Sequence, residues 1–412
     1  MRDADILIIG AGVMGVTIAL ELKKRFPDQN IQLIEKESIA GFHASGRNSG
    51  VLHAGFYYTA DSLKARFCRD GNRAMTQYCL ENNLTINRNG KLVITKNASE
   101  LTGLQTLYDR GIHNGVNLSL ISEKEAREIE PRVCTVEKAI FSPDTASVDP
   151  VEVMTSLVKK AEALGIHIHF NEQFISHDVK QKTVSTSKRK INVGFVVNAA
   201  GLYADKIAKQ YGFSKHYEIV PFKGLYLYSD EPVGALKTHI YPVPDLNYPF
   251  LGVHFTITAH GKIKIGPTAI PALWCEQYAG LSGLSFPEMA QILKREAILF
   301  LQNKFHFREV ALHEIKKYSK HFLATEAAYM INGFDVNHYQ KWGKPGIRAQ
   351  LIDTRNNALM TDFCYEGDQH SFHVLNAVSP AFTCSLPMAA FLVDKMALGS
   401  DLKLVCTKRP KQ

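Results

Sequence analysis

The chain has 412 residues, of which 45% are hydrophobic, enough for two packed domains. Its formal net charge of +8 is diffuse, and its short basic runs lack the interleaved aromatic residues of a nucleic-acid groove. We therefore expect no nucleic-acid partner. The positive balance suits an anionic small molecule or loose contact with an acidic membrane surface, and ordinary surface charge accounts for it equally well.

The seven cysteines are scattered and form neither a CxxC pair nor a cluster with histidine. This pattern indicates free thiols in a reducing compartment and gives no support for a metal site. No stretch has the length and apolarity of a membrane-spanning helix. An apolar strand begins so close to Met1 that we expect no signal peptide, and hence a cytoplasmic protein.

The most ordered stretch is the first one. An apolar run at residues 5–9 has the length and β-branched content of a buried parallel strand. A glycine-rich turn follows, with Gly10, Gly12 and Gly15, and then a helical pattern. A second apolar run at residues 31–34 ends on Glu35. Two strands, a helix and an acidic residue about twenty positions beyond the glycines make up the dinucleotide fingerprint.

Each of these residue types has a physical task. Gly10 allows the tight turn, Gly12 lets the backbone approach a pyrophosphate, and Gly15 lets helix and strand pack closely. The phosphates would bind the free N–H groups at the helix N-terminus. Glu35 can accept hydrogen bonds from ribose hydroxyls. The alternative, a glycine-rich turn in another α/β protein, lacks a reason for all these parts in register, so we expect a dinucleotide site.

Residues 44–58 combine three glycines and several small hydroxyl residues with a following group of ionisable side chains, His53, Tyr57 and Tyr58. Such a segment lets the backbone lie flat against a planar ligand and places titratable groups beside it. A helix is predicted next, at residues 62–81.

The later elements alternate at first and then change in character. Helices are predicted at residues 149–164, 285–301, 310–331 and 381–398, and strands at 90–95, 166–170, 174–179, 193–201 and 372–376. From residue 221 onward the pattern is alternating and rich in aromatic residues. It predicts antiparallel strands at 222–228, 239–241, 250–258 and 262–266, in a sheet that covers a cofactor and forms a substrate pocket.

Several separated pieces of chain resemble parts of one extended cofactor site, which favours FAD over a nicotinamide cofactor, because FAD buried along its length needs more of the chain. The predicted cofactor-binding residues are Gly10, Gly12, Gly15, Glu35, Ser45, Asn48, Ser49, Gly50, Val179, Ala200, Gly201, Ser379, Pro380 and Ala381. The expected fold is α/β (α+β). A Rossmann-like FAD-binding domain would be assembled from residues 1–85, 146–220 and 335–412, and a substrate domain with a mixed antiparallel sheet from 86–145 and 221–334.

Five stretches carry a family resemblance: residues 48–58, 241–245, 249–256, 266–269 and 346–350. With them, the chain from about residue 3 to about residue 398 resembles the D-amino-acid oxidase-like FAD-dependent oxidoreductases, and among these the L-2-hydroxyglutarate dehydrogenases (oxidases) most closely. The resemblance implies the D-amino-acid oxidase-like fold, also called the glutathione reductase-2 type. One departure is Ala381, where the family usually has glycine beside the flavin ring.

The resemblance implies oxidation of L-2-hydroxyglutarate to 2-oxoglutarate, in which a base takes the hydroxyl proton while a hydride leaves C2 for flavin N5. Histidine suits this task because its unperturbed pKa lies near working pH. The candidates are His254, in the predicted pocket sheet, and His53, after the loop expected beside the flavin. One of the two can equally be a histidine satisfied by a core hydrogen bond.

A dicarboxylate substrate also needs cations and hydroxyl groups. Arg348 can bind a carboxylate through two parallel hydrogen bonds, although a structural ion pair is an equal alternative. The further candidates are Tyr57, Tyr58, Tyr241 and, more weakly, Lys223. The helix that starts after Ser379 and Pro380 would direct its N–H groups at the flavin edge where negative charge builds up.

No second cofactor site is apparent in the sequence, so electrons would pass to an external acceptor, a quinone or oxygen. A respiratory acceptor would suit the basic amphipathic helices near residues 285–331 as a peripheral membrane contact, on the cytoplasmic face of the inner membrane; packing within their own domain is the commoner explanation for such helices.

Three other functions remain open. An amino-acid oxidase of the glycine or D-amino-acid type would share the FAD site but need an acceptor for the substrate ammonium. An L-malate-type 2-hydroxy acid dehydrogenase would share the chemistry. A non-catalytic flavoprotein would show a flavin spectrum that no hydroxy acid bleaches.

Overall fold

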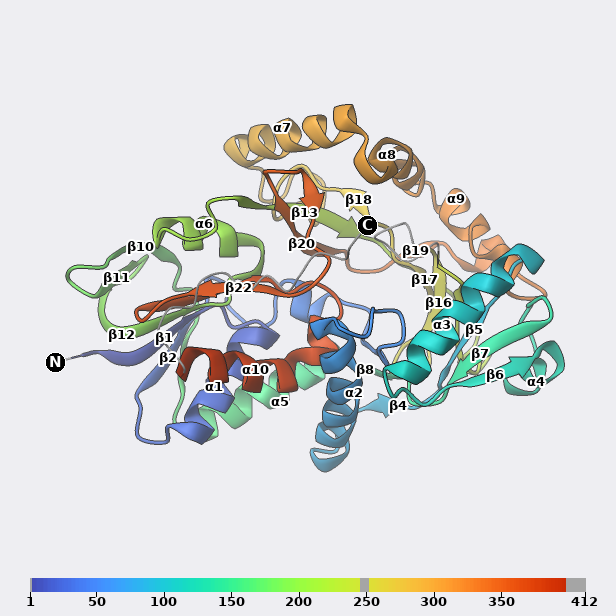
Figure 1. Cartoon of the computed structure of the whole chain (residues 1–412), viewed down its shortest axis with the longest axis horizontal. Coiled ribbons are helices and arrows are strands. Elements are labelled where there is room, and N and C mark those ends of the chain that lie inside the picture. Colours follow the sequence, from blue (N-terminus) through green and yellow to red (C-terminus); the bar gives the residue numbers. More distant parts are fainter. Residues whose placement is uncertain (1, 245–251, 398–412) are drawn as a thin grey trace. The chain divides into compact units, whose positions relative to one another are not determined.

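The computed structural model describes residues 2–244 and 252–397, and the chain forms two compact units (Figure 1). The first comprises Met1–Gly46, Pro150–Ile219 and Ala349–Gln412, and the second Arg47–Asp149 and Val220–Arg348. Residues 47–85, 146–149, 220 and 335–348, which were expected in the FAD-binding domain, fall in the second unit. A physical reason is that β3 (Val51–Leu52), just after residue 47, pairs with β8 (Ala146–Val148) in a small sheet of that unit.

The first unit is built on a mostly parallel sheet, as predicted. Its parallel strands lie in the order β9 (His167–His169), β2 (Ile31–Ile34), β1 (Ala4–Ile9), β12 (Lys190–Asn198) and β23 (Ser371–Asn376). Antiparallel strands extend it: β22 (Cys364–Gly367) beside β23, and β11 (Thr183–Thr186) and β10 (Phe174–Asp178) beside the start of β12. Figure 1 shows its blue, green and red segments, far apart in sequence, side by side.

Helices cover both faces of this sheet, which is why all four residues of β2 are buried. On one face lie α1 (Val13–Arg25), α5 (Pro150–Ala163) and α10 (Ala381–Ala397), with α1 packed against both of the others. On the other lies α6 (Ala204–Gln210), which packs on β12 and β23. The helices predicted at 149–164 and 381–398 are thus confirmed as α5 and, up to its last described residue, α10.

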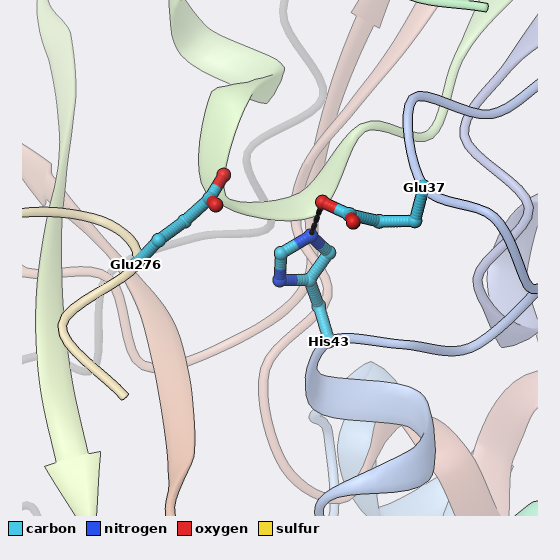
Figure 2. A group of neighbouring side chains, drawn as sticks. All are labelled: Glu37, His43 and Glu276. Atoms are coloured by element: carbon cyan, nitrogen blue, oxygen red, sulfur yellow. Dashed lines mark hydrogen bonds and ion pairs between the residues drawn. The ribbon is translucent and has the colours of Figure 1, made fainter. Parts of the chain in front are cut away.

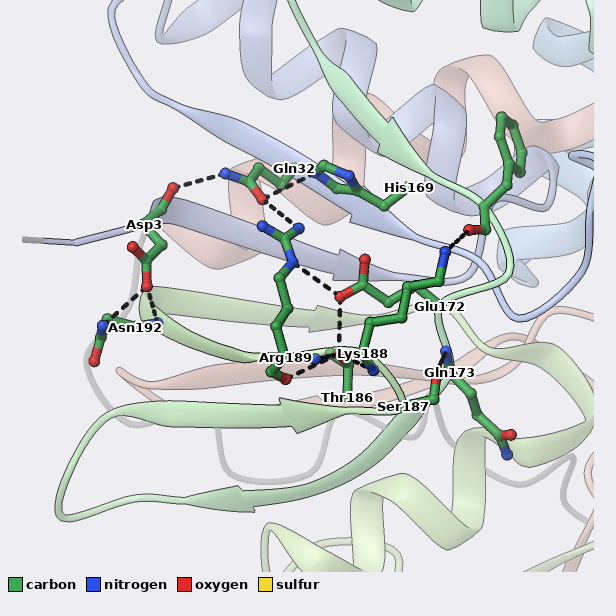
Figure 3. A network of polar contacts seen from close by, with 11 residues as sticks. Asp3, Gln32, His169, Glu172, Gln173, Thr186, Ser187, Lys188, Arg189 and Asn192 are labelled. Atoms are coloured by element: carbon green, nitrogen blue, oxygen red, sulfur yellow. Dashed lines mark hydrogen bonds and ion pairs between the residues drawn. The ribbon is translucent and has the colours of Figure 1, made fainter.

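A polar network holds the edge of the first sheet together (Figure 3). The Gln32 side chain donates to the carbonyl of Asp3 (2.6 Å), and its oxygen meets His169 Nε2 (3.2 Å) and Arg189 Nη2 (3.3 Å). Arg189 Nε also donates to Glu172 (3.1 Å). Loss of hydration, aided by the Arg189 charge, lowers the pKa of His169, so the network works with a neutral imidazole.

The second unit is built on an eight-stranded mixed sheet. Its strands follow the order β19 (Lys341–Trp342), β14 (Leu227–Tyr228), β17 (Ile263–Gly266), β16 (His254–Ile257), β15 (His239–Pro242), β5 (Lys91–Ile94), β7 (Lys138–Ser142) and β6 (Ser119–Ser122). In this order only β15 and β5 pair in parallel, and the other neighbouring strands pair antiparallel. The strands predicted at 239–241 and 262–266 correspond to β15 and β17, and the stretch 250–258, whose start lies outside the described residues, contains β16. The single strand predicted at 222–228 is wrong, because it is divided between β13 (Tyr217–Gly224) and β14, which lie in different sheets.

One face of this sheet carries the apolar core of the unit. Leu92, Ile240, Phe255 and Ile265, from four neighbouring strands, are at most 2% exposed. They pack with residues of α9 (Lys320–Thr325) and α4 (Glu123–Ile129). Because side chains alternate along a strand, the neighbours of these four residues point to the opposite face of the sheet, where the candidate site lies.

The remaining helices of the second unit are α2 (Leu63–Glu81), α3 (Leu101–His113), α7 (Phe286–Gln302) and α8 (Phe307–Lys316). A three-stranded sheet joins β3, β8 and β4 (Ile86–Asn87). The single helix expected at 310–331 is wrong: α8 ends at Lys316 and α9 starts anew, because the Ser319 side chain caps the N–H of Phe322.

The chain passes between the units within β13 (Tyr217–Gly224) and again within β20 (Gly346–Asp353). In the second unit β13 pairs with β18 (Ile270–Pro271), and in the first unit β20 pairs with β21 (Ala358–Leu359). None of the helices in the described residues has the length and apolarity needed to cross a bilayer.

Candidate functional site

The glycine turn of the first unit packs so closely that a side chain at either of two positions would collide with the backbone. Gly10 has φ +100°, and a Cβ there would lie 2.7 Å from the carbonyl oxygen of Ala199. A Cβ on Gly15 would lie 1.9 Å from the carbonyl oxygen of Gly10. The segment of Ala199 and Ala200, which directly follows β12, therefore lies against the turn.

The N-terminus of α1 opens from this turn without a capping side chain on its N-cap residue, Gly12. Instead Ser45, another predicted cofactor residue, accepts a hydrogen bond from the Val13 N–H (2.9 Å). Glu35, at the end of β2, accepts from the N–H of Ala11 (2.8 Å) and of Glu37 (3.0 Å). Burial raises the pKa of Glu35, while both N–H groups favour its ionised form.

The loop after Glu35 is held by its own polar side chains. His43 Nε2 lies 3.1 Å from Glu37 Oε1, as Figure 2 shows, and Lys36 Nζ approaches the same oxygen at 2.5 Å. Glu276, also drawn there, belongs to the second unit. The loop from Glu35 to Ser45 is therefore fixed at both ends, which positions the two predicted cofactor residues.

The remaining cofactor candidates are divided between the units. In the first, Gly201 (φ +54°) starts a short 3-10 turn, and Ser379 and Pro380 directly precede α10, whose first residue Ala381 is buried. Asn48, Ser49 and Gly50 belong to the second unit. There Asn48 Oδ1 accepts from the Gly50 N–H (2.8 Å), so this loop is shaped by its own side chains.

Val179 is not placed in a cofactor site, and its prediction is corrected. It is 51% exposed and follows β10, an antiparallel strand. In the same hairpin the carbonyl of Lys182 accepts from Val193, whose partner in β1 is Ala4. This hairpin end therefore lies at the start of β1, opposite the edge where β1 runs into Gly10.

In the second unit, the sheet face opposite the apolar core carries polar side chains at alternate positions. They are Lys91 on β5, His239 and Tyr241 on β15, His254 and Thr256 on β16, and Lys264 on β17. All are at most 6% exposed. The register aligns Lys91 with His239 and Thr256 with Lys264. Six polar groups on a buried face are unusual for a structural core, which normally excludes them unless they are paired.

His254 is held in one tautomer. Its Nδ1 lies 2.8 Å from the carbonyl oxygen of Gly252, so this nitrogen carries the proton and Nε2 keeps its lone pair. The imidazole stacks on Tyr241, with ring centroids 3.7 Å apart and planes at 21°. Burial, together with the nearby charges of Lys91 and Arg348, lowers the pKa of His254 well below its usual value. The ring is therefore neutral and able to accept a proton.

His53 and Arg348 belong to the same group of residues. Loss of hydration, with the charges of Lys91 and Arg348, lowers the pKa of His53 to about 3. Arg348 is partly buried at the end of the second unit, and its charge acts on both His53 and His254. The structure thus brings together both predicted histidines and the predicted carboxylate-binding arginine.

His239, by contrast, is a structural histidine. Its Nδ1 accepts from the Ile257 N–H (3.0 Å), and its Nε2 lies 3.3 Å from Ser147 Oγ. The Ser147 hydroxyl in turn donates to the Ile257 carbonyl (2.6 Å), so the imidazole Nε2–H donates to this serine. Both ring nitrogens are used, and no lone pair is left to act as a base.

The predicted tyrosines and Lys223 have different surroundings. Tyr57 and Tyr241 interact, and burial, together with the Tyr241 phenol, raises the pKa of Tyr57 well above its usual value. Tyr58 lies near the ammonium of Lys64, whose Nζ is 5.8 Å from the ring centroid. Lys223 is buried on β13, where it pairs with Ile270 rather than lying on the polar face, and burial lowers its pKa.

Sequence reasoning missed Lys91, His239 and Lys264 as members of this group. Lys264 donates to the carbonyl of Ser49 (3.1 Å), and burial lowers its pKa to about 8. The signal was present: each of these strands alternates polar and apolar residues, as in the pair Lys91 and Leu92. The pattern predicted a sheet that forms a substrate pocket but did not assign these three residues to it, and only the packed structure shows that both faces of the sheet are buried.

Comparisons with known proteins agree with this geometry. Residues 5–394 match the family described as FAD dependent oxidoreductase. The chain is 34% identical to an L-2-hydroxyglutarate dehydrogenase of Indibacter alkaliphilus, over 95% of this chain and 98% of that protein. It is 32% identical to the mitochondrial L-2-hydroxyglutarate dehydrogenase of Homo sapiens, over 97% of this chain and 89% of that protein.

Solved structures share the fold. The L-alpha-glycerophosphate oxidase of Mycoplasma pneumoniae, with FAD bound, matches with a TM-score of 0.75 at 22% identity, covering 100% of this chain and 97% of its own. Glycine oxidase of Geobacillus kaustophilus matches with a TM-score of 0.73 at 18% identity, covering 97% and 96%. The chain therefore belongs to the FAD-dependent oxidoreductase family and groups within it with the L-2-hydroxyglutarate dehydrogenases.

Proposed function

We propose that this protein oxidises L-2-hydroxyglutarate to 2-oxoglutarate. The observation that carries the proposal is the buried group in the second unit, where neutral His254 lies with His53, Tyr241 and the cation of Arg348. A proton acceptor beside a cation is what oxidation of an anionic hydroxy acid requires. The names of relatives at 32–34% identity over nearly the whole chain point to the same substrate.

The first unit fits FAD, the cofactor of the family. Gly10 and Gly15 let the turn pack tightly against its own backbone, and the N-terminus of α1, which opens from this turn, has no capping side chain on Gly12 and suits a pyrophosphate. The Glu35 carboxylate keeps lone pairs for ribose hydroxyls besides its two backbone hydrogen bonds. When bound, FAD supplies the acceptor for the hydride that leaves C2 of the substrate.

In this proposal His254 removes the proton of the substrate hydroxyl. Its Nδ1–H is fixed on the Gly252 carbonyl, so the lone pair of Nε2 is available. Loss of the hydroxyl proton to Nε2 and loss of the hydride from C2 together turn the alcohol into the ketone. His53 shares the group and remains the second candidate.

Arg348 binds the carboxylate next to the reacting carbon in this scheme. A guanidinium can donate two parallel hydrogen bonds to a carboxylate, which fixes its orientation as well as its position. Tyr241 orients the base instead, because its ring stacks on His254.

Oxidation of a 2-amino acid fits the group less well. A substrate ammonium needs an anionic acceptor, yet the charges that act on His53 and His254 in the described residues come from Lys91 and Arg348. These cations favour an anionic substrate and disfavour an ammonium.

The electrons would then pass to an external acceptor, a quinone or oxygen. A quinone would suit a cytoplasmic protein in peripheral contact with the inner membrane through α7, whose Phe286 and Leu301 are 67% and 76% exposed. Mixing the reduced enzyme with a soluble quinone or with air, and comparing the rates of flavin reoxidation, would separate the two acceptors.

An anaerobic spectrum tests the substrate. L-2-hydroxyglutarate should bleach the flavin band at roughly 450 nm, whereas the D-enantiomer, glycine and D-alanine should not. L-malate measures the tolerance for a shorter diacid. If L-2-hydroxyglutarate leaves the flavin oxidised, the substrate assignment falls; bleaching by an amino acid would favour an oxidase of that class instead.

A further inference from the structure

Lys91 lies where a lysine has little reason to be. It is the first residue of β5, in the middle of the eight-stranded sheet, in register with His239 of β15 and with Ser142 of β7. Its side chain is 0% exposed. A long, strongly hydrated side chain is almost never fully buried unless something pairs with it.

Aromatic rings enclose the ammonium. Lys91 Nζ lies 4.5 Å from the ring centroid of Phe56 and 4.7 Å from those of Tyr57 and Tyr241. Ring faces attract a cation, but this attraction does not replace the hydrogen bonds that an ammonium makes in water.

Within the described part of the chain, Lys91 Nζ has no hydrogen-bond partner, and neither has the buried hydroxyl of Tyr57. Three ammonium donors and one phenol donor therefore converge without an acceptor. Removing such donors from water without pairing them is unfavourable, so unpaired groups of this kind deserve a functional explanation.

Among the described residues, no carboxylate belongs to the groups that act on the Lys91 ammonium. The charged or ionisable groups that interact with Lys91 are His53, His239, His254 and Cys68. Burial lowers the pKa of Lys91 to about 7, the direction expected for an ammonium that lacks a counter-ion. An anionic ligand would supply both a hydrogen-bond acceptor for these donors and a negative charge to balance the ammonium.

We infer that the Lys91 ammonium binds the carboxylate of the substrate that is farther from the oxidised carbon, with the Tyr57 hydroxyl as a second donor. The inference rests on the proposed function and deepens it. A diacid needs two cationic partners, and the proposed function uses Arg348 for the carboxylate next to C2. Lys91 lies on the same buried sheet face as His254, which leaves it for the other carboxylate.

The test compares two unreactive ligands of the FAD-loaded enzyme by isothermal titration calorimetry. Glutarate has both carboxylates, whereas butyrate lacks the distal one. Lys91→Met should weaken glutarate binding roughly 100-fold and leave butyrate binding unchanged, because only glutarate loses a charge-assisted contact. Lys138→Met, the same substitution at an exposed position of the same sheet, should change neither.

Kinetics add a second contrast. Lys91→Met should lower kcat/KM for L-2-hydroxyglutarate and not for L-2-hydroxybutyrate, which has no distal carboxylate. An equal loss for both ligands, or no loss for glutarate, would overturn the inference.

Thermal unfolding without substrate separates a binding role from a structural one. Removing an unpaired buried charge should leave the midpoint of Lys91→Met equal to or above that of the wild type, whereas a lower midpoint would contradict the inference. The proposed function fails separately: if L-2-hydroxyglutarate does not reduce the wild-type flavin, the glutarate and butyrate titrations still decide the role of Lys91.

Discussion

The two units offer their ligands different parts of the chain. The first unit presents backbone: its turn is shaped by Gly10 and Gly15, and the N-terminus of α1 lacks a capping side chain on its N-cap residue. The second unit presents side chains, with His254 and Lys91 on the buried polar face of its sheet. A site formed by backbone needs glycine positions without side chains, so an added side chain there disrupts it. Side-chain sites depend on particular groups, so they fail selectively.

The largest effect, a loss of FAD, is expected when a side chain is added to the glycine turn of the first unit. Gly15→Val would place a Cβ 1.9 Å from the Gly10 carbonyl oxygen, so the turn must move and FAD should be lost on purification. The flavin absorbance per protein measures this. As a control, Gly224→Ala should retain FAD, because a Cβ there meets no atom closer than 3.6 Å. A Gly15→Val protein that retains FAD would contradict the assignment of this turn to the FAD site.

The next effect concerns the base. His254→Asn should slow flavin reduction by roughly 100- to 10,000-fold, the usual contribution of a general base, with FAD still bound. Anaerobic stopped-flow absorbance gives the rate. His53→Asn should have the smaller effect, and His113→Asn, at an exposed position of α3, should have none. If His53→Asn proves the slower variant, the two roles are exchanged.

A smaller effect is expected at Arg348. Arg348→Met removes a charge-assisted contact and should lower kcat/KM by about 10- to 100-fold for L-2-hydroxyglutarate and L-2-hydroxybutyrate alike. This equal loss is the opposite of the selective loss expected for Lys91→Met. Lys344→Met, at an exposed position nearby, serves as the control. A loss confined to the diacid would assign Arg348 to the distal carboxylate.

The smallest effect is a dependence of stability on pH. Lys91 has a pKa of about 7 when folded, against a usual 10.5, so the unfolded chain binds more protons between these values. Below pH 7 the buried charge of Lys91 therefore lowers the free energy of unfolding by its full amount. This destabilisation decreases as pH rises, by about 2 kcal/mol between pH 7 and 9. The thermal midpoint of Lys91→Met should exceed that of the wild type at pH 6.5, and the gap should be clearly narrower at pH 9. A gap that widens with pH would exclude the buried ammonium.

The contrast between backbone and side chains also explains what the sequence could predict. The turn after β1 depends on neighbours in the chain, so Gly10, Gly15 and Glu35 were readable from spacing alone. Lys91 depends on Phe56 and Tyr241, which approach from distant segments, so no local pattern revealed its burial. Val179 was misplaced because the local sequence shows a strand at 174–179 but not its antiparallel partner β11, which determines where that strand ends.

The three-segment build of the first unit has a consequence for the order of synthesis. The helix α1 emerges from the ribosome early, yet it packs against α10, which is made near the end. Arg25 of α1 donates to the Ala390 carbonyl (3.0 Å) and pairs with Asp394. β23, at Ser371–Asn376, likewise completes the sheet late. The FAD-binding unit can close only after almost the whole chain has been translated, so the cofactor must enter a finished polypeptide rather than a growing one.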